Sequence, residues 1–574
     1  MRLQRKWRSV LAVLVVAHVA GSSVFGYQSK SSSATRTQRA AQKQESIESL
    51  RARIAEHIGQ QRFDPASWGI KIVSLDSGKT VFERNPQKYF SPASNAKLYT
   101  AALALDRLGP EFRVKTSVYS EARPDAAGTL KGDLLIYGRG DPLMTARLNE
   151  GDYFKPLDPL VNALMNAGVR RIEGDLVGDD SFFTGPPFGS GWEWDDLQAD
   201  YGAEVSALTV EDNCLDLFVK PAEQVGLPGR ITTGPPTSYI TIMNRTQTVA
   251  RGNETRITVY RPVGENVVYV TGRLAIDGAG YSGSVAVHNP AALFATIFKD
   301  ALARRGVVVT GRSRSIDWKY REVSPIDFSK LAELCSIESA PLKDILRETL
   351  KPSQNMYAQL LLLHVGKSAS APETRRGEGE TRGRGEGETR GGASTGSRSP
   401  AVANGEPGVT TQQLGLDAMT DFLARVGVKE GDVLLEEGSG LSRKDVITPN
   451  ATVALLQYMS KHRWADVYYN ALPIGGIDGT LERRMKGTPA EGNVHAKTGT
   501  LRYVYTLSGF VTTAGGEKLA FSIMLNNYFN IERAAALRKT SSNGQPVPAP
   551  RDDIDTIAVM LAGFTGRAGP SRSH

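Results

Sequence analysis

Three short motifs stand far apart in this chain of 574 residues, and they constrain its fold more than any other feature. In order, they are Ser94-Asn95-Ala96-Lys97, Ser353-Gln354-Asn355 and Lys497-Thr498-Gly499. Each motif alone is a weak signal. Together they supply the hydroxyl, amine and amide groups with which a serine nucleophile can be activated without histidine. If they form one site, the chain must bring three distant segments together.

The residues around Ser94 predict the start of a helix. Ser91 and Pro92 interrupt the preceding segment, and residues 98–108 form an apolar run with helical spacing. Side chains three positions apart share one helix face, so Lys97 can take the proton of Ser94 if burial or a second cation lowers the lysine pKa. The alternative is a helix-capping serine beside a solvated lysine.

The second motif falls in a tight loop. Pro352 separates two helical patterns, residues 341–350 and 356–365, and the loop between them can project the Ser353 hydroxyl and the Asn355 amide into a cleft. An ordinary Ser/Asn turn is the alternative.

The third motif leads into a predicted hairpin made of residues 501–507 and 519–525. Gly499 in the first strand would let an extended substrate approach closely, or it is a plain edge-strand glycine. His495, two residues before Lys497, could be a base, but a histidine entering a strand favours a structural role.

The order of the elements predicts one domain inserted into another. Residues 68–84 form a hairpin pattern before Ser94, and residues 114–316 contain many short β-like runs with one clear helix near residues 290–305. Because Ser94 precedes this segment and Ser353 follows it, a single site requires the flanks to fold together while the intervening residues loop out.

Composition excludes a polyanion-binding protein. The net charge is +8, but the first 44 residues hold eight basic residues and no acidic one, so the remaining 61 basic residues balance the 61 acidic ones. The folded part therefore lacks the electrostatic footprint of nucleic-acid binding.

The N-terminus predicts export to the periplasm or cell envelope. Residues 1–26 combine a basic start with a short apolar stretch, which is typical of a secretory signal or, alternatively, an uncleaved membrane anchor. Residues 27–46 are polar and predict a disordered spacer. No other long apolar segment follows.

Cysteine and histidine patterns predict neither a metal nor a cofactor. Cys214 and Cys335 are the only cysteines, and they could form one disulfide or remain two buried thiols. The seven histidines are scattered, without ligand spacing.

One tract stands apart from the rest. Between residues 368 and 408 apolar residues almost vanish, and the sequence of residues 377–382 recurs at 385–390. Such a composition cannot bury a core and predicts a disordered loop, either a tolerated surface expansion or a tether.

Five further segments accompany the motifs: Gly138-Arg139-Gly140-Asp141-Pro142, Gly178-Asp179-Asp180-Ser181-Phe182-Phe183, Gly191-Trp192-Glu193-Trp194-Asp195-Asp196, Ser439-Gly440-Leu441-Ser442-Arg443 and Gly475-Gly476-Ile477-Asp478-Gly479-Thr480-Leu481. With them, residues 68–564 resemble the D-alanyl-D-alanine carboxypeptidases among the low-molecular-mass class C penicillin-binding proteins, of the penicillin-binding protein 4 type.

The resemblance implies an α+β fold: a β-lactamase/transpeptidase-like catalytic domain, with an antiparallel sheet flanked by helices, interrupted by a large β-rich insertion. We expect the catalytic domain in three parts, residues 47–114, 319–367 and 409–565. The insertion would be residues 115–318, the disordered tract residues 368–408 and the flexible tail residues 566–574.

The resemblance also implies the chemistry. Ser94 would attack the carbonyl of the penultimate D-alanine, with Lys97 as general base. Ser353 would relay a proton to the leaving amine, and Asn355 would orient Lys97 and bind the substrate amide. Water would then hydrolyse the acyl-enzyme, and β-lactams would acylate Ser94 in the same way.

Other residues would bind the substrate, a peptidoglycan stem peptide. The backbone N–H groups of Ser94 and Thr500 would form the oxyanion hole. The strand residues Lys497, Thr498 and Gly499 would hold the terminal carboxylate. Asp179, in the inserted region, would contact the amine of the stem-peptide diamino acid.

Two other functions fit parts of the pattern. A β-lactamase would share the three motifs, but the chain has no Glu-x-x-Leu-Asn element between Ser94 and Ser353, and the large insertion is atypical. A non-catalytic peptidoglycan-binding protein should have lost a motif residue, and none is lost.

Overall fold

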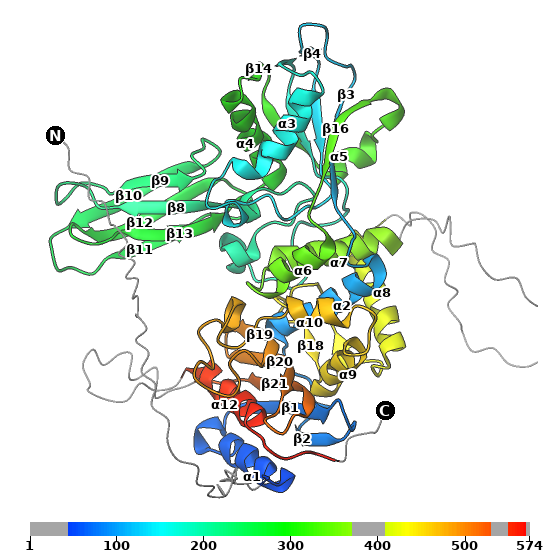
Figure 1. Cartoon of the computed structure of the whole chain (residues 1–574). Coiled ribbons are helices and arrows are strands. Elements are labelled where there is room, and N and C mark those ends of the chain that lie inside the picture. Colours follow the sequence, from blue (N-terminus) through cyan, green and yellow to red (C-terminus); the bar gives the residue numbers. More distant parts are fainter. Residues whose placement is uncertain (1–43, 370–407, 530–548, 570–574) are drawn as a thin grey trace, which may run out of the picture. The chain divides into compact units, whose positions relative to one another are not determined.

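The computed structural model describes residues 44–369, 408–529 and 549–569 (Figure 1). Four segments predicted from the sequence therefore lie wholly or largely outside the described residues: the signal or anchor, the spacer, the low-complexity tract and the C-terminal tail. Among the described helices, none is both long and apolar enough to cross a bilayer.

Two distant parts of the chain build one antiparallel sheet. β1 (Ser67–Ser74) and β2 (Thr80–Arg84) form the N-terminal hairpin, and β19 (His495–Leu501), β20 (Val504–Thr512) and β21 (Lys518–Asn526) come from the C-terminal part. β21 pairs with all of β1, which gives the order β19-β20-β21-β1-β2 and leaves β19 at an edge. The two flanks of the insertion thus fold together.

Side chains of β21 alternate between two hydrophobic cores, as the two-residue period of a strand requires. Phe521 and Ile523 pack with α1 (Ile47–Ile58) and α12 (Pro550–Ala562). Met524 faces the opposite core. The helices of that core are α2 (Ala96–Leu108), α6 (Leu342–Leu350), α7 (Asn355–Ala369), α8 (Thr411–Val426), α9 (Pro449–Met459) and α10 (Ala465–Ala471). The predicted α+β class is confirmed.

The residues between α2 and α6 fold around a separate core, coloured cyan and green in Figure 1. Their largest sheet has the order β15-β7-β5-β3-β16. Its strands are β3 (Lys115–Ser120), β5 (Leu134–Tyr137), β7 (Leu176–Asp179), β15 (Ser313–Ile316) and β16 (Ala332–Glu338). Since β16 pairs with β3, this sheet extends past residue 318, where the insertion was predicted to end. β16 alternates polar with apolar residues, and its Leu334 packs into the core of the inserted region.

Three smaller sheets complete the inserted region. They are β4 (Thr129–Lys131), β6 (Arg171–Glu173) and β14 (Val308–Val309); β8 (Cys214–Lys220), β9 (Arg230–Gly234) and β13 (Tyr281–Ala286); and β10 (Thr241–Val249), β11 (Arg256–Tyr260) and β12 (Val267–Ala275). The expected helix is α4 (Pro290–Arg304), while α3 (Asp158–Asn166) and α5 (Trp318–Val323) were not predicted. Cys214 and Cys335 are both free thiols.

Candidate active site

The turn before α2 presents Ser94 to Lys97. Ser94 lies in a single 3₁₀ turn, Ala93–Asn95, and Ala93 adopts a φ of 46°, which is unfavourable for a residue with a Cβ. Lys97, one helical turn later, donates from Nζ to Ser94 Oγ at 2.9 Å. The predicted helix start is therefore correct in place, but a short 3₁₀ turn precedes the α-helix.

Lys97 is fully buried among oxygen atoms. Besides Ser94, its Nζ donates to Asn355 Oδ1 at 2.5 Å and to the backbone carbonyl of Ser439 at 2.7 Å. Burial lowers the pKa of Lys97 to about 7, although the charges of Glu437 and Asp445 oppose this change. A large share of Lys97 is therefore a neutral amine at neutral pH, and a neutral amine can accept a proton.

A second buried lysine meets the same loop. Lys497 Nζ donates to Ser353 Oγ at 2.8 Å and to the carbonyl of Thr498 at 2.8 Å. Burial, followed by the charges of Lys97 and Arg484, holds the pKa of Lys497 well below its usual value. Ser353 and Asn355 thus each bind one of the two lysines, so the three motifs form one connected cluster.

The loop between α6 and α7 adopts an unusual backbone conformation that places Ser353 and Asn355 against the two lysines. Ser353 has a φ of 70°, in the left-handed region. Asn355, the first residue of α7, donates from Nδ2 to the carbonyl of Tyr201 at 2.8 Å. Because Tyr201 belongs to the inserted region, that region reaches the motif cluster.

Gly499 is required for packing within the chain. A Cβ at this position would lie 2.2 Å from Thr506 Oγ1 and 2.7 Å from the carbonyl of Pro92. The backbone that approaches this glycine is therefore the turn before Ser94, whereas the sequence suggested a substrate. Thr498 donates to Thr480 Oγ1 at 2.7 Å, and Thr500 is exposed on the edge strand β19.

Asp179 lies apart from this cluster. It ends β7, its side chain is 0% exposed, and Arg321 donates to its Oδ2 from Nη2 at 2.6 Å and from Nε at 2.9 Å. Its Oδ1 accepts the backbone N–H of Ser181. A substrate amine could pair with Asp179 only by displacing Arg321, so the geometry does not support the expected contact with the stem peptide.

His495 also has a structural setting. Its ring stacks on Tyr469 with a centroid separation of 4.0 Å, and burial lowers its pKa. Within the described parts of the chain, no three His, Cys, Asp or Glu side chains gather as a metal site would require.

Two residues of the cluster were not predicted as site residues. Ser439 supplies a carbonyl to Lys97, and Glu437 lies behind it. The sequence offered a signal, since Ser439-Gly440-Leu441-Ser442-Arg443 contributed to the family resemblance. The sequence could not assign Ser439 its role, because the contact is made by a backbone carbonyl, which every residue has.

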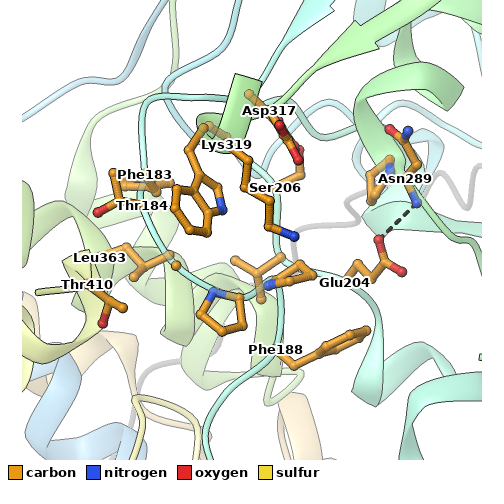
Figure 2. Close-up of a pocket in the computed structure, with 18 of the residues that line it drawn as sticks. Phe183, Thr184, Phe188, Glu204, Ser206, Asn289, Asp317, Lys319, Leu363 and Thr410 are labelled. Carbon is orange, nitrogen blue, oxygen red and sulfur yellow. Dashed lines mark hydrogen bonds between the residues drawn. The ribbon is translucent and has the colours of Figure 1, made fainter. Parts of the chain in front are cut away.

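A large cavity lies elsewhere, between the inserted region and helices α7 and α8 (Figure 2). It measures about 760 Å³, and Phe183 and Phe188 contribute aromatic walls. At its rim, Glu204 accepts the backbone N–H of Asn289 at 2.9 Å. No residue of the three motifs lines it, so cavity volume does not locate the chemistry.

Comparison with known proteins agrees with the motif cluster. The sequence model of the D-Ala-D-Ala carboxypeptidase 3 (S13) family matches residues 50–381 and 397–543. The D-alanyl-D-alanine carboxypeptidase of Actinomadura sp. (strain R39) is 32% identical over 536 residues, which cover 91% of this chain and 86% of that protein. The D-alanyl-D-alanine carboxypeptidase DacB of Haemophilus influenzae is 28% identical, over 80% of this chain and 85% of that protein.

One solved structure is similar to this protein over most of the length of both chains. Penicillin-binding protein 4 (dacB) from Haemophilus influenzae superimposes with a TM-score of 0.67 and 24% identity, covering 89% of this chain and 98% of that one. The same protein has been solved in complex with a β-lactam; that structure gives a TM-score of 0.62 and 23% identity, with the same coverage. These matches show the shared fold.

Proposed function

The chain belongs to the D-Ala-D-Ala carboxypeptidase 3 (S13) family, and from that premise we propose that Ser94 is the nucleophile with which it removes the terminal D-alanine of peptidoglycan stem peptides. The observation that carries the proposal is the short contact of Lys97 Nζ with Ser94 Oγ inside a fully buried cluster. The predicted N-terminal signal places this activity in the periplasm or cell envelope.

Acylation begins with a proton transfer. Neutral Lys97 takes the proton of Ser94 as Oγ bonds to the carbonyl carbon of the penultimate D-alanine. The N–H groups of Ser94 and Thr500 stabilise the oxyanion, a contribution of about 3 kcal/mol per donor. The C–N bond to the terminal D-alanine then breaks. The leaving nitrogen takes the proton of Ser353 Oγ, which is replaced by the proton that Lys97 took from Ser94, so Lys97 is neutral again.

Lys497 couples substrate binding to this step. The terminal carboxylate of the peptide binds beside Lys497 and Thr498, and its negative charge favours the protonated form of Lys497. The resulting cation, which interacts with Lys97, favours the neutral form of that lysine. Substrate binding therefore increases the fraction of the base that can accept the Ser94 proton.

Deacylation restores the enzyme. A water molecule gives a proton to Lys97 as its oxygen bonds to the acyl carbon, and the ester bond to Ser94 Oγ breaks. The shortened peptide leaves with a new carboxylate, and Ser94 regains its proton. A β-lactam places its strained amide where the D-Ala-D-Ala bond lies, so it forms the same ester on Ser94.

The test uses Ser94→Ala, with Ser49→Ala on an exposed position of α1 as the matched control. Wild type and Ser49→Ala should be labelled by fluorescent penicillin and should release D-alanine from a D-Ala-D-Ala peptide. Ser94→Ala should do neither, because it removes the hydroxyl group that Lys97 Nζ contacts. Covalent labelling that persists in Ser94→Ala would refute the assignment.

A further inference from the structure

A buried carboxylate shapes the loop that contacts Lys97. We name residues 437–442 the Glu437 loop. The Glu437 side chain is 0% exposed, and its two oxygens accept four backbone N–H groups of its own loop. Oε2 accepts from Ser439 at 2.7 Å, and Oε1 accepts from Gly440 at 2.5 Å, Leu441 at 2.9 Å and Ser442 at 3.4 Å. Several N–H donors to one carboxylate hold the loop in one conformation.

The conformation of the Glu437 loop determines two catalytic positions. It aims the Ser439 carbonyl at Lys97 Nζ, 2.7 Å away. It also brings Gly440, with a φ of 79°, against the turn that precedes Ser94, where a Cβ would lie 1.9 Å from the carbonyl of Ala93. Glu437 therefore acts on both the base and the nucleophile without contacting either directly.

A second buried carboxyl group, Asp445, stands beside Glu437. Its Oδ1 accepts the N–H of Glu436 at 2.8 Å, while Oδ2 is buried and finds no hydrogen-bond partner among the residues that the structure describes. Burial and the neighbouring charge of Glu437 raise the pKa of Asp445 well above its usual value. Two adjacent carboxylates cannot both ionise in such a site. A protonated Asp445 could donate to Glu437, with which its side chain interacts.

We propose that Glu437 and Asp445 share one proton, and that the single negative charge of this pair holds the Ser439 carbonyl on Lys97 and sets the pH at which Lys97 can accept the Ser94 proton. Glu437 and Asp445 are positioning residues in this scheme. The proposal rests on the proposed role of Ser94 and Lys97 and extends it to the groups that tune the base.

The other charges near the pair fix the direction of the effect. Lys97 approaches from α2 with Lys497 behind it on β19, and Glu436 lies on the far side of Asp445. Burial lowers the pKa of Lys97, and the negative pair opposes that change. Removing the negative charge should therefore lower the pKa of Lys97 further, and the neutral base should persist to lower pH.

The experiment compares Glu437→Gln with Asp445→Asn in the full chain. The rate constant for acylation by a fluorescent penicillin is measured between pH 5 and 9. The acid limb of this pH profile, where the rate falls as the pH is lowered, reports the protonation of Lys97. Glu437→Gln faces the loop N–H groups with a neutral amide, and burial, the larger cause of the raised Asp445 pKa, keeps Asp445 protonated beside it. The negative charge of the pair is then lost, so the acid limb should move down by about one pH unit. The plateau rate should also fall, by tenfold or more, because the loop loses its acceptor.

Asp445→Asn should leave the acid limb where it is in wild type. If Asp445 already carries the proton, the neutral amide changes no charge and can still donate to Glu437. Equal displacement of the limb in the two variants would show that both carboxylates are ionised, and it would overturn the shared proton. An unchanged limb and plateau in Glu437→Gln would overturn the positioning role.

A spectroscopic measurement covers the case in which Glu437→Gln does not fold. Burial raises the pKa of Asp180 to about 7 and that of Glu211 to about 8, so these groups also contribute to the carbonyl band of protonated carboxyl groups. The measurement is therefore the infrared spectrum of wild type minus that of Asp445→Asn at pH 7, which should contain the carbonyl band of one protonated carboxyl group. If the difference spectrum lacks that band, the proposal is wrong. Failure of wild type to react with penicillin would refute the proposed function instead, and the infrared result would be unaffected by it.

Discussion

Buried charged residues in the two regions of this molecule can have opposite surroundings, as Asp179 and the two motif lysines show. In the inserted region, Asp179 is fully buried, but two donors of Arg321 neutralise it. In the catalytic region, Lys97 and Lys497 are fully buried, and no carboxylate forms an ion pair with either one within the described residues. Their partners are hydroxyl, amide and carbonyl oxygens.

We expect this difference in surroundings to separate a structural charge from a reactive one. A paired charge stays ionised and contributes to one fixed conformation, whereas a buried lysine without an ion-pair partner shifts its pKa toward the working pH. The sequence alone makes Asp179 and Lys97 comparable, since each is a polar residue in a segment typical of the family. Their surroundings separate the structural residue from the reactive one.

The largest effect should come from removing the base. Lys97→Met keeps the length of the side chain and removes the amine, so acylation of Ser94 by penicillin should slow by about a thousandfold. Lys429→Met, at an exposed lysine, is the matched control. Stopped-flow or gel-based labelling measures both. Acylation of Lys97→Met within tenfold of wild type would mean that another group takes the proton.

The second largest effect should be a loss of stability caused by a substitution in the inserted region. Asp179→Asn leaves Arg321 without its buried partner, so the free energy of unfolding should drop by about 3 kcal/mol. Asp158→Asn, which breaks an exposed pair with Arg305, should cost less than about 1 kcal/mol. Denaturant unfolding measures both values.

The same variant distinguishes a structural from a substrate-binding Asp179. The folded fraction of Asp179→Asn should hydrolyse peptides with and without a free side-chain amine in the wild-type ratio of kcat/KM. A selective loss on amine-bearing peptides, without a loss of stability, would restore the role that the family resemblance implied for Asp179.

The smallest effect should come from the low-complexity tract. The helices on either side of it pack closely, since Gly366 of α7 lies against the carbonyl of Thr411, the first residue of α8. A short connection can therefore replace residues 372–406, and deleting them should leave the melting temperature and penicillin labelling nearly unchanged. A marked loss of either would assign the tract a role in the fold or the site.

The sequence predicted the parts of this site that depend on side-chain identity. Ser94, Lys97, Ser353 and Lys497 could be named because their spacing and their setting on helix, loop and strand are local properties. The order of the elements predicted the insertion, and the resemblance to the family implied the α+β fold. The family and its carboxypeptidase function, first indicated by that resemblance, are confirmed by the family match.

Other features depend on tertiary contacts, which no local pattern records. Arg321 meets Asp179 across 142 positions, and Ser439 meets Lys97 across 342. β16 joins the inserted sheet by pairing with β3, and this pairing brings Ala332 opposite the distant Ser120. The sequence suggested that Gly499 lets a substrate approach closely, but the backbone of the turn before Ser94 packs against this glycine.

The central claim is that Lys97 is a neutral buried base at neutral pH, and titration of its side-chain nitrogen tests it most directly. In protein labelled with ¹⁵N-lysine, the Nζ resonance assigned by comparison with Lys97→Met should titrate with a pKa of about 7. Because this pKa is depressed, the reactive form is present above about pH 7, and the acylation rate should fall about tenfold per pH unit below it. A Lys97 resonance that titrates near the ordinary value of 10.5 would contradict the account.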